Sequence, residues 1–137
     1  MRNIPIAVLI PAVMKKAGLV WIEPTGAPAS AVWMVWHEST CYVLHGGGEQ
    51  IVPGLADTST CYVITRSATT RERTLRWKAD VHHVQSETAE WNELLPLLIA
   101  KRLNLSDYEQ APQRWARECM LSRLHPSISR APAALDD

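Results

Sequence analysis

The chain has 137 residues, which is enough for one domain with a buried hydrophobic core. It carries 14 Lys and Arg against 14 Asp and Glu, so its formal net charge is zero. This balance argues against general binding to nucleic acids or membrane surfaces, which both need an excess of positive charge. The three cysteines are odd in number and show no C-x-x-C spacing, which predicts reduced thiols and a cytoplasmic protein.

Residues 1–16 are expected to form an N-terminal segment with a short helix. We predict this helix over Pro11–Ala17, because proline is favourable in the first turn and Gly18 is a typical stop. The apolar run Ile4–Met14 is too short to span a membrane, so we expect no membrane-spanning segment here.

Five strands are predicted next, at close intervals and separated by turn residues such as Pro53–Gly54. The sequence S-T-C-Y-V occurs at residues 39–43 and again at 59–63, which supports two strands with similar surroundings. Short strands joined by tight turns favour a meander or barrel over βαβ units. The predicted strands cover residues 19–23, 30–37, 41–45, 60–66 and 74–84.

The strand over residues 30–37 is apolar on both of its faces. Ala31, Trp33 and Val35 alternate along it with Val32, Met34 and Trp36. A sheet with one wet face would alternate apolar and polar residues, so this strand must be covered on both sides. We expect a barrel interior on one face and a helix or a partner subunit on the other. The second cover, together with zero net charge, predicts a homodimer.

A helix is predicted after the fifth strand. Ser86 can cap it, and its apolar stripe has the i, i+3, i+4, i+7 spacing of an amphipathic helix. Pro96 either kinks this helix or divides it. The stripe consists of Trp91, Leu94, Leu95 and Leu98.

Residues 113–125 fit no single period, and both helix and strand remain open for them. We favour a helical turn at their start and a sixth strand near 119–124. The main domain is predicted to span residues 17–126, and the Pro-, Ala- and Asp-rich segment 127–137 is predicted to be a disordered tail.

The order of the predicted elements resembles that of the FMN-binding split barrels, the pyridoxamine 5′-phosphate oxidase-like superfamily. Several local motifs also resemble an actinobacterial subfamily of it, over roughly residues 17–126. The motifs are Ala31-Val32-Trp33, Trp36-His37, Gly46-Gly47-Gly48-Glu49-Gln50, Pro53-Gly54-Leu55, Trp77-Lys78-Ala79, Lys101-Arg102-Leu103-Asn104 and Arg114-Trp115-Ala116-Arg117.

The resemblance implies a mainly β fold, a six-stranded split barrel with flanking helices that forms a homodimer. It implies FMN or a deazaflavin in the groove between subunits, and a flavoprotein oxidoreductase that transfers a hydride to a small substrate. Since the cofactor carries such chemistry, no catalytic residue stands out. Two alternatives remain open: a non-catalytic binding protein that kept the barrel and lost the cofactor, and a haem-binding relative with His45 or His125 as ligand.

In such proteins the region corresponding to residues 31–50 lines the flavin. That places Trp36, His45, the loop Gly46, Gly47 and Gly48, and Gln50 at the cofactor by resemblance. Glycine backbone can also bind an anion directly, although a bulged turn explains the same residues.

The cations that usually hold the cofactor phosphate are absent here, since no Lys or Arg occurs over residues 17–65. Arg66, Arg71, Arg73, Arg76 and Lys78 then follow closely and form either a solvated face or a replacement clamp. Within this group, Arg66 or Arg76 is the expected phosphate ligand.

Aromatic and metal-binding candidates complete the set. Trp36 and Trp77 can stack on a flat heterocycle, but the barrel core or a dimer interface is the favoured interpretation. His37 and Cys41 come near each other across one turn, whereas His45 lies at the far end of its strand. Because zinc needs three or four converging ligands, we predict no metal site from these residues.

Overall fold

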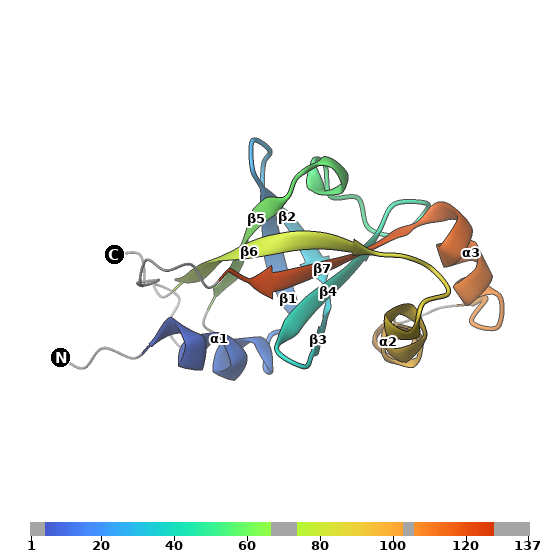
Figure 1. Ribbon diagram of the computed structural model, residues 1–137, viewed down its shortest axis with the longest axis horizontal. Helices are drawn as coiled ribbons and strands as arrows, with labels where there is room; N and C mark the ends of the chain where they lie inside the picture. Colours follow the sequence, from blue (N-terminus) through green and yellow to red (C-terminus); the bar gives the residue numbers. More distant parts are fainter. Residues whose placement is uncertain (1–4, 67–73, 103–105, 128–137) are drawn as a thin grey trace.

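The computed structural model describes residues 5–66, 74–102 and 106–127. It consists of one antiparallel sheet with three α-helices and one 3₁₀ helix (Figure 1). None of the helices in these described ranges is long and apolar enough to cross a membrane. The elements are α1 (Ile6–Met14), β1 (Leu19–Pro24), β2 (Ser30–Trp33), β3 (Val35–His37), β4 (Thr40–His45), η1 (Leu55–Asp57), β5 (Thr60–Arg66), β6 (Thr74–Val84), α2 (Ala89–Lys101), α3 (Ala111–Glu118) and β7 (Met120–Pro126).

The sheet closes on itself through one interrupted strand. Its order is β2-β1-β5-β6-β7-β4-β3, so β2 and β3 are the two edges. These edges are consecutive in the chain and are separated only by the buried Met34. The predicted strand over residues 30–37 thus pairs with β1 through its first half and with β4 through its second. The predicted mainly β barrel is confirmed, with this one strand divided in two.

The barrel interior is filled by alternate residues of the strands. Leu75, Trp77, Ala79 and Val81 of β6 all point into this core, as their alternation predicts. Helix α1 adds Ile10 and Met14 to the same cluster.

Helix α1 corrects one prediction, because it covers Ile6–Met14 and contains Pro11 instead of beginning there. Ile10 and Met14 are one turn apart, and their burial in the barrel core fixes the position of the helix. That burial outweighs the backbone hydrogen bond that Pro11 cannot make.

A second core lies outside the barrel, between the sheet and helices α2 and α3. Val35 of β3 and Leu44 of β4 face Leu98 of α2 and Trp115 of α3 in this cluster. The two helices lie at the same end of the molecule in Figure 1. The outer face of the two-faced strand is therefore covered mostly by this chain's own helices.

The C-terminal half follows the predicted order with two adjustments. Helix α2 is capped by Thr88, whose hydroxyl accepts from the backbone N–H of Trp91 at 3.2 Å, and not by Ser86. Pro96 lies inside this helix without dividing it. The ambiguous segment resolves into α3 and β7, and the predicted tail lies outside the described residues beyond Ser127.

Candidate functional site

An open hollow on the outer face of the barrel brings one predicted cation together with an aromatic ring. The register pairs Ile64 of β5 with Arg76 of β6, and Tyr62 with Lys78. Arg76 lies over Tyr62, with its Cζ 3.5 Å from the ring centroid. Its Nη2 donates to Oε1 of Glu23 on β1 at 3.1 Å. A stacking partner and an acid together hold the guanidinium in place.

The hollow has a volume of about 440 Å³. The hollow is lined by residues 24–28, at the end of β1 and in the loop that follows it, and by Glu23, Tyr62 and Arg76. A guanidinium at such a rim can bind phosphate in a bidentate manner. An anionic ligand would compete with Glu23 for Arg76.

The other predicted cations are placed less fully. Lys78 is exposed and lies two residues after Arg76, on the same outer face of β6. Arg66 is the last residue of β5, where its backbone pairs with Thr74, and its side chain is outside the described set. Arg71 and Arg73 lie outside the described residues.

The glycine loop packs closely against the end of α3. A Cβ atom on Gly47 would lie 2.3 Å from the carbonyl oxygen of Glu118, so only glycine fits there. The loop also binds itself, because the N–H of Gly46 donates to the carbonyl of Gln50 at 2.7 Å. Cys119 donates through Sγ to the carbonyl of Gly46 at 3.2 Å. Packing against α3 thus accounts for at least one of the three glycines.

Glu49 is a buried carboxylate whose partners come from two later motifs of the sequence. Its side chain is 2% exposed and accepts from Nε of Arg102 at 2.8 Å. It also accepts from Nε1 of Trp115 at 3.1 Å and from Nη1 of Arg114 at 3.4 Å. The Arg114 guanidinium bonds to Asp107 at 2.9 Å as well and holds the pKa of that carboxyl below its usual range. Because its charge is paired in this way, the buried carboxylate of Glu49 links the glycine loop to α3 and to the end of α2.

Gln50 closes the barrel at the point where its ring is interrupted. Its Oε1 accepts from the backbone N–H of Trp33 at 2.7 Å, and its Nε2 donates to the Trp33 carbonyl at 3.0 Å. The same Nε2 donates to the carbonyl of Leu44 at 3.1 Å. The amide side chain therefore takes the place of a strand neighbour at the end of β2.

His45 lies inside one end of the barrel, in a chain of three polar side chains. Its Nε2 is 2.7 Å from Oγ of Ser122, and Nδ1 of His83 is 2.9 Å from the same oxygen. Burial lowers the pKa of His45 to about 4, with a smaller contribution from the charge of His83. His45 is thus neutral near pH 7.

The two tryptophans of the predicted site pack on each other in the core. Their ring centroids are 6.3 Å apart and the rings cross at 80°, an edge-to-face arrangement. Trp77 is 2% exposed and Trp36 is half-buried against the barrel core. This placement favours the core interpretation over stacking on a ligand.

Sequence comparisons give no match, either to protein-family models or to curated proteins. Solved structures are similar in fold. The haem storage protein HutZ from Vibrio cholerae covers 92% of this chain and 93% of its own, with TM-score 0.63 and 12% identity. An F420 reductase covers 85% and 92%, with TM-score 0.58 and 15% identity. A candidate pyridoxamine 5′-phosphate oxidase from Listeria innocua covers 89% and 94%, with TM-score 0.58 and 9% identity.

The chain has the split-barrel fold of the pyridoxamine 5′-phosphate oxidase-like proteins. In this split barrel, the predicted site residues fall into separate places. Arg76 and Lys78 share the outer face with the hollow, whereas His45 and Trp77 are buried in the barrel. Gln50 lies at the seam of the barrel, which is the interruption between the edge strands β2 and β3, and the glycine loop comes just before Gln50 in the chain.

Sequence reasoning missed three contributors. Tyr62 and Glu23 position Arg76, and alternation along β5 and β1 is the signal that places them on its face. Glu49 is the third, because the fold buries its side chain and pairs it with Arg102 and Arg114. The arginines in the two later motifs were the available signal for its partners.

Proposed function

We propose that this split barrel binds a flavin or deazaflavin on its outer face, with Arg76 as a ligand of the cofactor phosphate. The single observation that carries the proposal is the guanidinium of Arg76, held over Tyr62 at the rim of the hollow. Similarity in fold to an F420 reductase and to a candidate pyridoxamine 5′-phosphate oxidase supports it. A bound flavin or deazaflavin accepts and returns a hydride, so the protein needs to supply only position and electrostatics.

The residues around the hollow fit a phosphate in charge and in shape. Arg76 presents planar N–H donors, and Lys78 adds a second positive charge on the same face. Glu23 keeps Arg76 oriented while no anion is present, and a phosphate dianion competes with its single charge. Exchange of Glu23 for phosphate is therefore the binding step that we assign to these side chains.

Visible absorbance of the purified protein, followed by titration with FMN and with the deazaflavin, tests the proposal. Arg76→Ala is expected to weaken cofactor binding about ten- to a hundredfold, since a charged hydrogen bond contributes roughly 1.5–3 kcal/mol. Glu23→Gln is expected to act in the opposite direction and to tighten binding several-fold. Arg117→Ala is the matched control, because Arg117 is an exposed arginine of α3 that pairs with its neighbour Glu118 at 3.5 Å.

Three outcomes count against the proposal in different ways. If Arg76→Ala binds like the wild type, the phosphate lies elsewhere. If Glu23→Gln weakens binding as much as Arg76→Ala, then Glu23 acts by holding Arg76 and not by competition. A wild type that binds neither cofactor supports the non-catalytic alternative.

Haem binding is the second candidate, and one exposed histidine favours it. His125 on β7 is exposed, and its Nδ1 lies 3.2 Å from Oγ1 of Thr40, a contact that orients the ring. The fold similarity to a haem storage protein supports the same candidate. His45 fits an iron ligand poorly, since it is buried and its Nε2 bonds to Ser122. Haem titration of the wild type and of His125→Ala separates this candidate from flavin binding through the Soret absorbance.

A further inference from the structure

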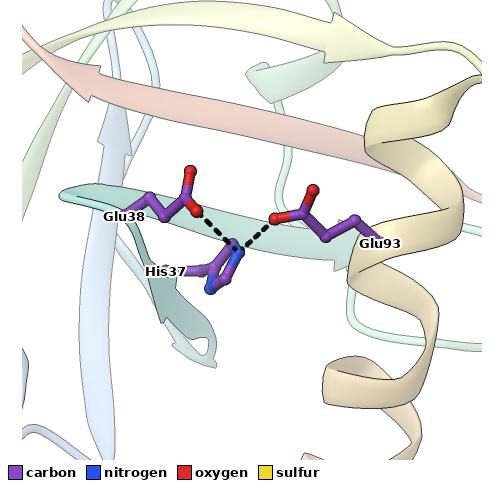
Figure 2. A group of neighbouring side chains, drawn as sticks. All are labelled: His37, Glu38 and Glu93. Carbon is purple, nitrogen blue, oxygen red and sulfur yellow. Dashed lines mark hydrogen bonds and ion pairs between the residues drawn. The ribbon is translucent and has the colours of Figure 1, made fainter.

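An imidazole and two carboxylates converge where the hairpin β3–β4 meets helix α2 (Figure 2). Nε2 of His37 lies 2.6 Å from Oε2 of Glu93 and 3.8 Å from Oε2 of Glu38. The donor atoms of the three residues all lie within 4.8 Å of one another. None of the three lines the hollow at Arg76.

The hairpin fixes two of these donors. His37 pairs with Thr40 at the last register position before the turn. Glu38 and Ser39 form the two-residue turn itself, with φ of 49° and 61°. Such a turn matches the twist of the flanking strands, so the direction of the Glu38 side chain follows from the hairpin. His37 is 27% exposed, which leaves its ring accessible from solvent.

The helix fixes the third donor. Glu90, one turn before Glu93, accepts from the hydroxyl of Tyr42 at 2.8 Å and from Nη1 of Arg123 at 3.0 Å. These bonds tie α2 to β4 and β7. Glu93 is therefore carried to His37 on an anchored helix.

The acids of this cluster differ from several other acids of the structure in having no basic side chain of Lys or Arg as a partner among the described residues. Glu23, Glu49, Glu90 and Asp107 each bond to an arginine. In contrast, no Lys or Arg of the described ranges lies within 4.0 Å of Glu38 or Glu93, and their shared neighbour is an imidazole. Two carboxylates and one imidazole nitrogen face the same point. That set of donors attracts a cation.

We propose that His37, Glu38 and Glu93 form a site for a divalent transition-metal ion, of which Zn²⁺ is the type. Imidazole together with carboxylate suits Zn²⁺ and its neighbours better than Mg²⁺ or Ca²⁺, which prefer oxygen ligands alone. Three protein ligands leave a fourth position for water.

The observed distances bracket those that zinc requires. Ligand bonds of about 2.0–2.1 Å in a tetrahedron place neighbouring donor atoms roughly 3.3 Å apart. The two contacts of His37, at 2.6 Å and 3.8 Å, lie on either side of that value. Small rotations of the exposed Glu38 and Glu93 side chains are enough to reach it. The ion takes the lone pair of Nε2, so any proton on that nitrogen is released to solvent or moves to Nδ1.

Calorimetric titration of the full chain with ZnCl₂ at about pH 7 tests the site. The wild type is expected to bind one Zn²⁺ per chain. Glu93→Gln and His37→Gln are each expected to weaken binding at least about tenfold, as loss of one ligand from a three-ligand site does. Co²⁺ in place of Zn²⁺ reports the ligand set directly, because its visible spectrum changes with coordination.

The control variants keep the experiment decisive. Glu87→Gln removes an acid just before α2 that has no part in the cluster, and it is expected to bind Zn²⁺ like the wild type. His82→Asn removes an exposed histidine of β6 and tests for binding elsewhere on the surface. Glu38→Gln changes only an exposed turn residue and serves if a His37 variant fails to fold. A wild type without stoichiometric binding, or correctly folded His37 and Glu93 variants that bind as well as it does, overturns the proposal.

Discussion

Gln50 and Trp33 are joined by two hydrogen bonds between one side chain and one main-chain unit. The amide accepts from the Trp33 N–H at 2.7 Å and donates to its carbonyl at 3.0 Å. A strand neighbour would make this same pair of bonds. The side chain thus extends the hydrogen bonding of the sheet on the side of β2 where no other strand of the described residues pairs with it.

Replacing Gln50 by Ala is expected to destabilise the fold by about 2–3 kcal/mol, because it leaves backbone groups of Trp33 and Leu44 without partners in a half-buried place. Urea denaturation measures the change. Gln113→Ala, on the exposed side of α3, should stay within about 0.5 kcal/mol of the wild type.

Gln50→Glu sharpens this prediction with an isosteric change. It places a carboxylate oxygen against two carbonyls, and it should cost at least as much as the alanine variant. If both Gln50 variants unfold at the wild-type midpoint, the seam does not depend on this side chain.

Gly47 and Gly48 offer a matched pair, because both have positive φ but only one of them is crowded. Gly47→Ala is expected to cost about 3 kcal/mol or more, since its Cβ would meet the backbone of Glu118 at 2.3 Å. Gly48→Ala has nothing within 4 Å of its Cβ and should cost only the left-handed backbone penalty of about 1–2 kcal/mol. Thermal unfolding of the two variants compares these costs. Equal losses would show that the loop can move away from α3.

The stability of the fold should fall as the pH is lowered through the range in which His45 differs between folded and unfolded chains. Its pKa is about 4 when folded, against an ordinary value of 6.5, so only the unfolded chain takes up this proton between those two values. Stability therefore rises with pH in that window, and this term should be roughly 2 kcal/mol smaller at pH 5 than at pH 7. Urea denaturation at several pH values measures the slope. The free energy of unfolding of His45→Gln should depend less on pH than that of the wild type. If its slope against pH is unchanged, groups other than His45 cause the effect.

Much of the fold could be predicted from the sequence because strand periodicity is local. The alternation along β6 identifies its buried face, and the doubly apolar strand predicts a barrel interior on one side and a helix or a partner subunit on the other. The position of α1 could not be predicted, since it depends on burial of Ile10 and Met14 against strands far along the chain. Local preference for proline in a first turn gave the wrong start.

The candidate site was less predictable, because its contacts join distant segments. Glu49 lies 53 residues from Arg102 and 65 from Arg114 in the sequence. The periodicity of a helix or strand cannot predict contacts between residues so far apart. His37 and Glu93 are likewise 56 residues apart. Arg76 was identifiable as one of two cations on the polar face of its strand, together with Lys78. Its contacts with Tyr62 and Glu23 could not be predicted, because they depend on the register of three strands.

The three cysteines are expected to be unpaired and to differ in reactivity. Burial raises the pKa of Cys61 to about 12 and raises that of Cys41 further. Cys119 is half-buried, and its pKa is raised to about 11. Since the thiolate is the reactive form, a thiol reagent should modify Cys119 first in the native protein and all three after denaturation. Recovery of a single thiol without reductant would show a disulfide instead.

An exposed apolar surface on β1 and β2 favours the predicted homodimer. Leu19 is 57% exposed, and the register places it beside Trp33, with Trp21 beside the exposed Ala31. The helices of the second core do not cover Leu19 or Ala31, so a second copy is the expected cover. Light scattering at micromolar concentration should give about twice the chain mass of 15.3 kDa.

Leu19→Arg tests whether this surface forms the dimer, because a charge at the centre of an apolar interface cannot be buried without a partner. The variant should scatter as a monomer and keep the circular dichroism spectrum of the folded wild type. Val8→Arg is the matched control, since Val8 is equally exposed, at 60%, but lies on α1, away from these strands. It should remain a dimer. A monomeric wild type would contradict the prediction outright, and a dimeric Leu19→Arg would place the interface on another face.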